Sequence, residues 1–346
     1  MWLVSGGVIA FSVIYFTIFI ASIVGNSCIL AAVYKHEKLH TTVNILLSNV
    51  ALSDLLFTIF SLANCIEFLL QEWVLTDIGC RIQGTLIEVF YTASIITLSV
   101  IAVERYLIIC RTRRTKRTPL ACIKVSGVIW LVSFVFCSPL FYAWTATPNK
   151  DGKVECYNNR WSNQARLIFY TIHAFFVYLL PLGLMIFTHY KLSATLKVTA
   201  ESSNCTGKSG GNGGNYSPNN ERKPVSYLWK KKQRQRHRKV IQLLITVTAL
   251  FAILWGPFIG VRLLDHAGVQ VSNLAWMLTQ SIAFTNTAVN FFIYSAINPD
   301  LRKAFRSFSC CDDSLEFEVV SDSSKAEHHD RDEVRAKRIS TNTSSV

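Results

Sequence analysis

Residues 80–106 read CRIQGTLIEVFYTASIITLSVIAVERY, an apolar segment that opens with a cysteine and closes with Glu104-Arg105-Tyr106. As an α-helix, the step from Cys80 to Arg105 extends about 37 Å at about 1.5 Å per residue, slightly more than a bilayer core of about 30 Å. The segment therefore puts a disulfide-capable cysteine at one membrane face and an acid next to an arginine at the other. This arrangement favours a signalling protein that connects two compartments.

The composition is typical of a membrane protein. Hydrophobic residues make up 51% of the 346 residues and charged residues only 16%, whereas soluble domains average about 25% charged residues. Apolar runs long enough to span a bilayer occur at Leu3–Tyr34, Thr42–Leu70, Ile78–Cys110, Leu120–Trp144, Ala165–Lys191, Val240–Leu264 and Val271–Ile297. The first run is far longer than the apolar core of a cleavable signal peptide, so we expect a retained anchor.

The basic residues predict the orientation of these spans. The segment Trp229–Lys239 holds seven Lys and Arg residues and no acid, and Arg111–Arg117 holds five more, whereas Glu72–Asp77 and Asp265–Gln270 hold none. Because basic loops favour the cytoplasmic side, we expect a multi-pass protein of the plasma membrane with its N-terminus outside and its C-terminus in the cytoplasm. The net charge of +13 then faces anionic lipid. Nucleic-acid binding is not expected, because the basic runs flank spans and lack interleaved stacking aromatics.

The ten cysteines predict a single disulfide. Five fall in or beside apolar spans (Cys28, Cys65, Cys110, Cys122 and Cys137), and three fall in cytoplasmic segments (Cys205, Cys310 and Cys311). Only Cys80 and Cys156 remain for the oxidising side, so we predict a bridge between them. The alternative is two free thiols.

Polar residues inside the spans reveal a family pattern. Five of them lie where lipid makes an unpartnered polar group costly, namely Asn26, Asp54, Ser94, Asn286 and Asn290. The motifs around them are Gly25-Asn26, Leu52-Ser53-Asp54-Leu55, Trp73 before Cys80, Glu104-Arg105-Tyr106, Trp130, Pro181 and Trp255-Gly256-Pro257. With these motifs at this spacing, the chain resembles the rhodopsin-like (class A) G-protein-coupled receptors over roughly Gly25 to Phe305. The stretch Ser94-Ile95-Ile96-Thr97 to Tyr106 is similar to that of neuropeptide receptors.

The resemblance implies an all-α fold, a seven-transmembrane helix bundle with a short amphipathic eighth helix. We expect the bundle over residues 1–298, including a flexible cytoplasmic loop at 200–229 that is rich in Gly, Ser and Asn. Residues 299–311 should form the amphipathic helix on membrane lipid, with Cys310 and Cys311 as palmitoylation candidates. Residues 312–346 should be a disordered cytoplasmic tail that recruits arrestin after phosphorylation.

The resemblance also implies a sodium site inside the bundle. The residues that would line it are Asp54, Ser94, Asn286, Asn290 and Trp255. Oxygen ligands suit a hard cation of this kind. Sodium would act as an allosteric ion, and no cofactor is required. The alternative is a protonated Asp54 in an ordinary interhelical hydrogen-bond network, since burial disfavours the charged carboxylate.

For activation, the resemblance implies one set of residues at the cytoplasmic side and another in the core. The coupling set is Glu104, Arg105, Tyr106, Asn290 and Tyr294, and the transmission set is Ile95, Pro181, Phe251, Trp255 and Pro257. Arg105 would pair with Glu104 at rest and turn to the G protein when the sixth span swings outward about Pro257, where proline removes a helical hydrogen bond. Simpler alternatives are an arginine that snorkels to the membrane surface and ordinary apolar packing at Ile95 and Phe251.

Several positions depart from the family pattern. Phe291 stands where the seventh span usually has proline, which should reduce the kink there. His189 occupies the usual place of a tyrosine, eight residues after Pro181, and Leu254 replaces a common cysteine. Lys230–Lys239 also lacks the carboxylate that forms a second inner lock in some family members, so we expect a weaker restraint on the inactive state.

The ligand is predicted only by class. Ile87 stands at the position of the aspartate of amine receptors and Phe284 at that of the retinal-binding lysine, so both of those ligand types are disfavoured. The candidate ligand-binding residues carry both signs of charge and several aromatic rings: Gln83, Glu88, His173, Phe258, Arg262, Asp265, Trp276 and Gln280. This mixture favours a short amidated neuropeptide with a basic residue. Each of these residues is alternatively an ordinary polar residue at a helix end.

The sequence therefore predicts a receptor that binds an extracellular ligand, a short neuropeptide, and activates a heterotrimeric G protein. A class A receptor for a non-peptide small molecule, such as a lipid, nucleoside or indole, is the first alternative. A transporter or channel is the second, although it predicts broken helices or repeated halves, and neither is visible. An enzyme is not expected, because no nucleophile–base or metal-ligand cluster occurs in the spans.

Overall fold

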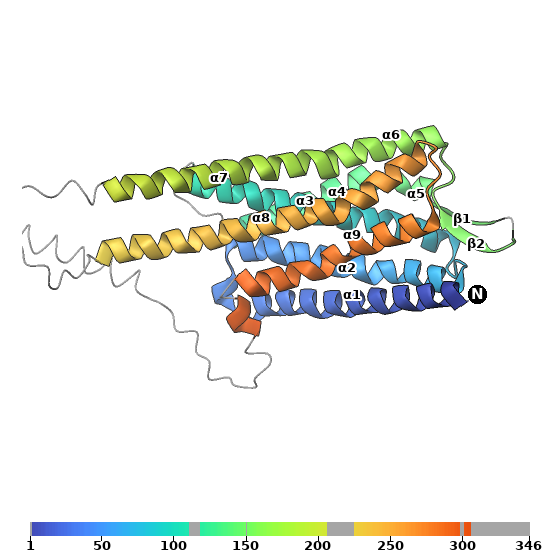
Figure 1. The fold of residues 1–346 in the computed structure, drawn as a ribbon, viewed down its shortest axis with the longest axis horizontal. Coiled ribbons are helices and arrows are strands. Elements are labelled where there is room, and N and C mark those ends of the chain that lie inside the picture. Colours follow the sequence, from blue (N-terminus) through green and yellow to red (C-terminus); the bar gives the residue numbers. More distant parts are fainter. Residues whose placement is uncertain (1, 111–117, 150, 206–224, 298–300, 306–346) are drawn as a thin grey trace, which may run out of the picture. The chain divides into compact units, whose positions relative to one another are not determined.

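The computed structural model describes residues 2–110, 118–149, 151–205, 225–297 and 301–305, all within the unit formed by residues 1–305 (Figure 1). Its elements are α1 (Trp2–Lys35), η1 (Glu37–Leu39), α2 (Thr42–Leu70), α3 (Asp77–Cys110), α4 (Pro119–Cys137), α5 (Leu140–Ala143), β1 (Thr145–Pro148), β2 (Val154–Tyr157), α6 (Asn163–Ala174), η2 (Phe175–Leu179), α7 (Leu180–Cys205), α8 (Val225–His266) and α9 (Asn273–Ile297). The predicted all-α class is confirmed.

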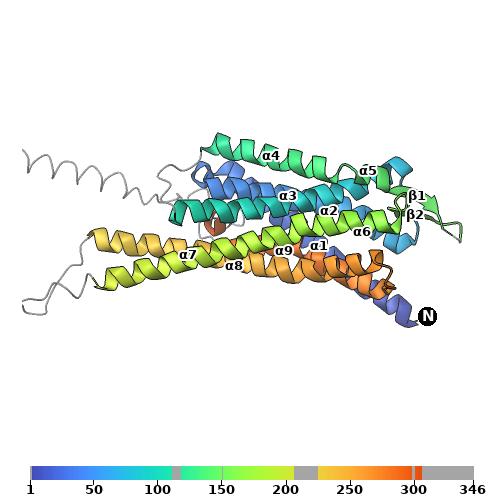
Figure 2. The same ribbon diagram turned by 90° about the horizontal axis from the view of Figure 1, so that it is seen from above.

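Within the described residues, six helical segments are long and apolar enough to cross a bilayer: Phe11–Lys35, Thr42–Leu70, Asp77–Ile108, Pro119–Ala143, Asn163–Thr195 and Ile241–His266. The fifth of them combines α6, η2 and α7. The predicted seventh span, α9, has 25 residues and is more polar, since it contains Asn286, Asn290 and several threonines and serines. It packs along α8 and α1 and completes the bundle (Figure 2).

Local sequence signals account for where the helices begin. The side chains of Thr41, Thr118 and Ser162 each accept a hydrogen bond from the backbone N–H three residues later, at the start of α2, α4 and α6. Such caps satisfy backbone donors that the first helical turn leaves unpaired. Pro119 then occupies the first position of α4, where its missing N–H costs nothing.

The fifth span contains a wider turn. Residues Phe175–Leu179 form the π-helical segment η2 between α6 and α7. Pro181 lies two residues after its end and cannot donate a helical hydrogen bond, so the backbone pattern has to change in this region. Tyr178, on the wide turn, donates a hydrogen bond from its hydroxyl to the Ala252 carbonyl of α8 at 2.9 Å. The wide turn thus brings a polar side chain to the helix that contains Pro257.

The third span lies at the centre of the bundle. In the apolar window of α3, 72% of the residues are buried, against 22% for α4. α3 packs against α2, α4, α5 and α7, and against the hairpin that precedes α6 (Figures 1 and 2). The segment that suggested a membrane protein in the sequence is therefore the one around which the other helices are arranged.

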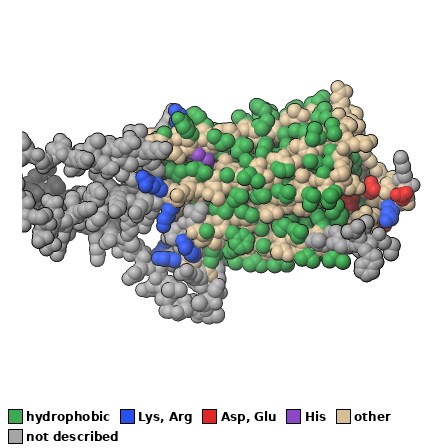
Figure 3. Space-filling model, in the orientation of Figure 1, with side chains coloured by type: hydrophobic (Ala, Val, Ile, Leu, Met, Phe, Trp, Pro, Cys, Tyr) green, Lys and Arg blue, Asp and Glu red, His purple; other side chains and the backbone are tan. Residues whose placement is uncertain are grey.

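The surface of the bundle divides into three zones. Apolar side chains cover the middle of the face shown in Figure 3, as expected for a lipid-facing belt. Acidic side chains gather at the end that carries the β1–β2 hairpin, among them the exposed Glu72, Asp151 and Glu155. The opposite end carries the exposed basic residues Lys35, Lys38, Lys124, Arg238, Lys239, Arg302 and Lys303.

Some predicted boundaries differ from the structure or fall outside it. The predicted loop at 200–229 is narrower, because α7 continues to Cys205 and α8 begins at Val225. The charged residues that open α8 are good helix formers, which accounts for its early start. Residues 301–305 are helical, in line with the start of the predicted amphipathic helix. Cys310, Cys311 and the predicted tail at 312–346 lie outside the described residues.

Gly25 leaves room for Phe291, the residue that replaces the usual proline of the seventh span. A Cβ atom at Gly25 would lie 2.7 Å from both Cβ and Cγ of Phe291. Contacts this short do not occur between carbon atoms in folded proteins, so the two helices approach closely only because residue 25 has no side chain. The Phe291 ring also lies 5.2 Å from that of Phe305, measured between centroids.

We expect Gly25→Ala to destabilise the bundle by about 1–3 kcal/mol, the usual cost of overpacking a close contact. Gly127→Ala is the matched control, because Gly127 is exposed on α4 and a Cβ there meets nothing within 4 Å. The measurement is the Tm of the purified protein in nanodiscs. Equal Tm values for the two variants would contradict the close α1–α9 contact.

Candidate functional site

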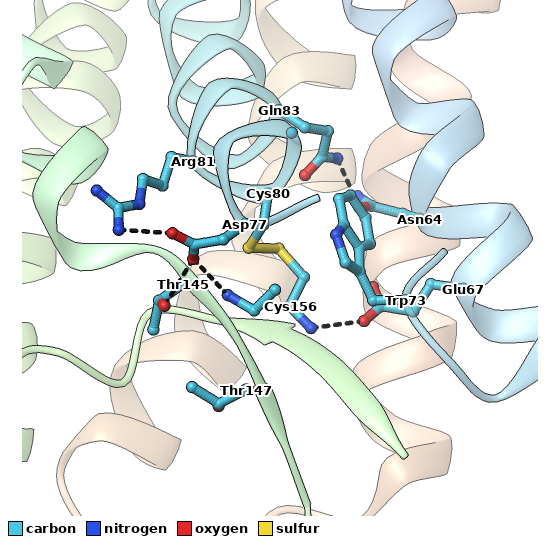
Figure 4. Close-up of a disulfide and its surroundings, with 12 residues drawn as sticks. Asn64, Glu67, Trp73, Asp77, Cys80, Arg81, Gln83, Thr145, Thr147 and Cys156 are labelled. Carbon is cyan, nitrogen blue, oxygen red and sulfur yellow. Dashed lines mark hydrogen bonds and ion pairs between the residues drawn. A yellow bond between two sulfur atoms is a disulfide. The ribbon is translucent and has the colours of Figure 1, made fainter. Parts of the chain in front are cut away.

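A disulfide joins the hairpin to the top of the third span. Cys80 and Cys156 are bonded, with their Cα atoms 5.6 Å apart (Figure 4). Strands β1 and β2 pair antiparallel, with Ala146 opposite Cys156. The Glu67 carboxylate accepts a hydrogen bond from the Cys156 N–H at 2.9 Å. The predicted disulfide is confirmed, and a carboxylate of α2 supports it from the other side.

The hairpin has a second anchor at Asp77, the first residue of α3. Its carboxylate accepts hydrogen bonds from the Thr145 hydroxyl at 2.7 Å and the Ala146 N–H at 3.0 Å (Figure 4). The guanidinium of Arg81 lies 2.5 Å from the same carboxylate. Because α3 holds the hairpin at both Asp77 and Cys80, the outer ends of α2 and α3 are covered by a fixed segment.

A cavity of about 100 Å³ lies in the half of the bundle that carries the hairpin, between α1, α2, α3, α8 and α9. Aromatic side chains dominate its wall: Phe11, Tyr15, Phe57, Phe68, Tyr91, Trp255, Phe258 and Phe284. Its polar lining consists of Ser61, Asn64, Gln280, Ser281 and Glu88. Glu88 is the one charged side chain among the lining residues.

Two of the charged residues predicted to bind a ligand, Glu88 and Arg262, pair with each other. An ion pair joins the Arg262 guanidinium of α8 to the Glu88 carboxylate of α3, and both residues are buried. His173 of α6 completes the group, with Nε2 at 3.4 Å from Glu88 Oε2 and 3.3 Å from the Thr92 hydroxyl. The candidate residues thus carry both signs of charge, but Glu88 and Arg262 neutralise each other.

The other predicted ligand residues are dispersed. Phe258 and Gln280 line the cavity, and the ring of Trp276 lies 5.9 Å from that of Phe258. Gln83 instead donates a hydrogen bond to the Asn64 side chain at 2.6 Å. Asp265 is partly exposed at the end of α8, beside His266. Of the eight predicted residues, the structure thus brings three to the cavity wall and two more to the Glu88 group.

Sequence reasoning missed the aromatic floor of the cavity. Tyr91 stacks on Trp255 with ring centroids 4.0 Å apart, and the Trp255 ring also contacts Phe57 and Phe258. Tyr91 follows Glu88 by three residues and so lies on the same face of α3. That spacing was the signal available in the sequence. The stack joins the cavity to the core of α8.

A polar network lies below the stack, around Asp54 of α2. The hydroxyl of Ser94 donates to Asp54 Oδ1 at 2.9 Å, and the amide of Asn290 donates to Asp54 Oδ2 at 2.8 Å. Three spans therefore meet at one carboxylate. Asn286 and Trp255, predicted for the same site, are buried but do not hydrogen-bond to Asp54.

The Asp54 carboxylate is 3% exposed, and no Lys or Arg among the described residues forms an ion pair with it. Its hydrogen-bond donors are neutral. The available oxygen atoms are the carboxylate pair and the Ser94 hydroxyl, and the Asn290 amide can present its oxygen when turned over. This donor set fits a small hard cation such as sodium.

Further polar pairs join the spans on either side. Asn49 of α2 donates to the Thr97 hydroxyl at 2.8 Å and accepts from the Trp130 indole N–H at 2.9 Å. Asn26 of α1 donates to the Thr287 carbonyl of α9 at 3.0 Å. Every one of these groups would be costly without a partner in lipid, so they specify which helices lie next to one another.

The predicted coupling residues lie at the inner ends of the spans. Glu104 is buried, Arg105 and Tyr106 are partly buried, and Tyr294 of α9 is buried. Of the predicted transmission residues, Ile95, Pro181, Phe251 and Trp255 are buried, whereas Pro257 lies on the exposed face of α8.

One further contact joins α7 to α8 in the inner half. His189, which stands where the family has tyrosine, has its Nε2 3.0 Å from the Thr248 hydroxyl. Both residues are buried. The inner segment of α8 lacks a carboxylate, and this hydrogen bond connects it to the neighbouring helix by different chemistry.

Comparison with known proteins identifies the family. Residues 25–294 match the 7 transmembrane receptor (rhodopsin family), which covers well over half of the chain. The chain is 28% identical to neuropeptide FF receptor 2 of Rattus norvegicus over 318 residues, covering 86% of this chain and 72% of that receptor. It is 27% identical to the QRFP-like peptide receptor of Branchiostoma floridae over 315 residues (86% and 77%). It is also 24% identical to 5-hydroxytryptamine receptor 4 of Homo sapiens over 315 residues (86% and 78%). These relatives are receptors and not enzymes.

Proposed function

We propose that this chain, which belongs to the rhodopsin family of seven-transmembrane receptors, binds an extracellular peptide and thereby activates a heterotrimeric G protein. The observation that supports this most is a series of contacts that follow one another along α3. It leads from the outer cavity through the Tyr91–Trp255 stack to α8, while the Asp54 network below it joins α2, α3 and α9.

The names of the relatives favour a peptide ligand. The two with the highest similarity reported above are receptors for neuropeptide FF and a QRFP-like peptide. The amidated neuropeptide expected from the sequence is consistent with them. A receptor for a small molecule is the second candidate, because the cavity holds only about 100 Å³ and an amine receptor is among the relatives. Ile87, at the position of the amine-binding aspartate, argues against an amine.

The proposed orientation puts the hairpin outside the cell. The end of the bundle opposite the hairpin carries the exposed basic residues described above, which the positive-inside bias assigns to the cytoplasm. The start of α1 lies at the hairpin end (Figure 1). The plasma membrane is the proposed location, because the disulfide-bonded hairpin and the binding of an extracellular ligand both require a segment that faces the outside of the cell.

In the proposed mechanism, ligand contact at the cavity moves the Trp255 stack, and α8 turns about the Pro257 region so that its inner end moves outward. Proline removes one helical hydrogen bond, which lowers the resistance to bending there. The Tyr178–Ala252 hydrogen bond connects the wide turn of the fifth span to the same region. Arg105 then contacts the G protein. Arrestin would follow phosphorylation of the tail, with Cys310 and Cys311 as lipid anchors, all outside the described residues.

The first test is second-messenger output (cAMP and calcium) in cells expressing the chain. The panel contains neuropeptide FF, galanin and neuropeptide Y as amidated or related peptides, with 5-hydroxytryptamine and nucleosides alongside. We expect a response to a peptide, lost in Arg105→Ala while binding remains, since Arg105 acts at the other end of the bundle. Lys124→Ala is the control, because Lys124 is exposed at the same end.

A response to small molecules alone would contradict the proposed peptide ligand but would still support the proposal that the chain is a receptor. Undiminished signalling by Arg105→Ala at equal surface expression would contradict the proposed coupling role. Binding of peptide without any second-messenger change would contradict activation of a G protein.

We further propose that sodium binds at Asp54 and Ser94 and favours the closed state, so that sodium and agonist oppose each other by linkage. Sodium would supply the positive charge that no described side chain provides. At a sodium concentration ten times the Kd, binding stabilises the protein by about 1.4 kcal/mol.

We expect sodium chloride, relative to choline chloride, to raise the Tm of the unsubstituted protein in nanodiscs and to leave that of Asp54→Asn unchanged. Asparagine keeps the shape and one of the two acceptor oxygens while removing the charge. A protonated Asp54, the alternative reading, predicts no difference between the two salts for either protein.

The His189–Thr248 contact suggests a restraint on the inner half of α8. A net hydrogen bond contributes about 0.5–1.5 kcal/mol, so Thr248→Val should raise ligand-independent signalling about two- to tenfold. Thr188→Val on α7 is the control, because the Thr188 hydroxyl bonds to carbonyls of its own helix. Basal signal, normalised to surface expression, is the readout. An equal rise in both variants would show that the effect is not specific to this contact.

A further inference from the structure

We infer that the outer cavity accepts an uncharged group of the ligand and excludes a cationic one, because Glu88 already holds Arg262. This rests on the cavity being the ligand site, as proposed above, and it names the chemistry of the part of the ligand that enters. If the cavity excludes a cation, the basic residue expected in the peptide binds outside this cavity.

The pair is buried from both sides. Glu88 is 7% exposed and Arg262 is 5% exposed. Arg262 Nη1 donates to Glu88 Oε1, and His173 approaches Oε2 from α6. The three residues come from three different spans, and no other ion pair among the described residues joins α3 to α8.

Aromatic faces also compensate the guanidinium. Arg262 Cζ lies 4.3 Å from the centroid of the Tyr170 ring and 5.1 Å from that of Phe258. Cation–π contacts of this length are attractive, and more so where water is excluded. Arg262 is therefore held by one carboxylate and two rings, so its departure from Glu88 would cost more than the ion pair alone.

The cavity side of the group offers neutral chemistry. Glu88 lines the cavity and Arg262 does not, so any ligand group meets the carboxylate with its charge already balanced. The remaining polar atoms on the wall are uncharged: they belong to the amides of Asn64 and Gln280, the hydroxyls of serine and tyrosine side chains, and the Trp255 indole. A cavity of about 100 Å³ is smaller than the engineered cavity of about 150 Å³ that holds benzene, so it admits at most one compact group of the ligand.

A cation in this cavity would have to take Glu88 from Arg262. Breaking a buried pair leaves the remaining charge without compensation, which is one of the most costly changes a protein interior undergoes. An aromatic ring or a carboxamide makes no such demand, because it can stack on the aromatic wall and hydrogen-bond to the amides. The Glu88–Arg262 pair thus selects against a cationic ligand group in this cavity.

The test uses two probes of the same shape, uncharged 4-fluorobenzamide and cationic 4-fluorobenzamidine, of which only the amide or amidine end has to enter the cavity. Binding to the purified full chain in nanodiscs is followed by fluorine NMR. We expect the unsubstituted protein to bind the amide and to bind the amidine at least about tenfold more weakly. Arg262→Leu should reverse the order, because it leaves a buried carboxylate that a cation can neutralise.

Two further variants keep the test decisive. Arg262→Gln retains a hydrogen bond to Glu88 and removes the charge, so it should gain amidine binding even if the leucine variant folds poorly. The double variant with Glu88→Gln and Arg262→Leu contains neither charge, so it should show no preference for the amidine. Loss of that preference in the double variant assigns the binding to this site.

The inference is overturned if the unsubstituted protein binds the amidine as tightly as the amide in a Glu88-dependent manner, or if neither Arg262 variant gains amidine binding. Because probe binding involves no G protein, the result is separable from the proposed function. Amide selectivity in a chain that gives no second-messenger response would contradict the signalling proposal and support this one. A receptor that signals but shows no charge selectivity would support the signalling proposal and contradict this inference.

Discussion

The hydrogen bonds made by the Asp54 carboxylate are the interaction on which the bundle most depends. A bilayer core contains no water, so a buried carboxylate must find its partners on neighbouring helices. Asp54 finds them in Ser94 of α3 and Asn290 of α9, residues 40 and 236 positions away in the chain. Asn49, five residues earlier on α2, does the same with Thr97 and Trp130 of α3 and α4. α2 is therefore the helix that sets the positions of its neighbours.

The outer half of the bundle is organised by covalent and ionic contacts instead. The Cys80–Cys156 disulfide and the carboxylates of Glu67 and Asp77 hold the hairpin over the ends of α2 and α3. Beneath it, the Glu88–Arg262 pair joins α3 to α8. One helix, α3, thus carries the hairpin, the ion pair, the aromatic stack and the polar network in order along its length. The cavity and the end of the bundle that carries Glu104 and Arg105 are thus joined by this single helix.

Much of this was predictable because lipid imposes simple rules on a sequence. The bounds of α2 agree with the predicted span at both ends, and the disulfide follows from which cysteines can reach the oxidising side. The Asp54–Ser94–Asn290 contact agrees with the family resemblance. The pairing of Glu88 with Arg262 was not predicted, because the two residues are 174 positions apart and their contact depends on how α3 and α8 approach each other. The close fit of Gly25 against Phe291 likewise depends on how two helices, α1 and α9, approach each other.

The sequence by itself determined the number of spans and their approximate positions, the disulfide and the family, since each depends on hydropathy, compartment or a local motif. The tertiary structure decided which polar groups remain available to a ligand or an ion. An isolated charge and a neutralised one look the same in a sequence, and their difference is set by atoms a few ångströms apart on separate helices. Arg262 satisfies Glu88 in this fold, whereas no described basic side chain satisfies Asp54. That contrast makes one carboxylate a neutral part of the cavity wall and the other a candidate cation site.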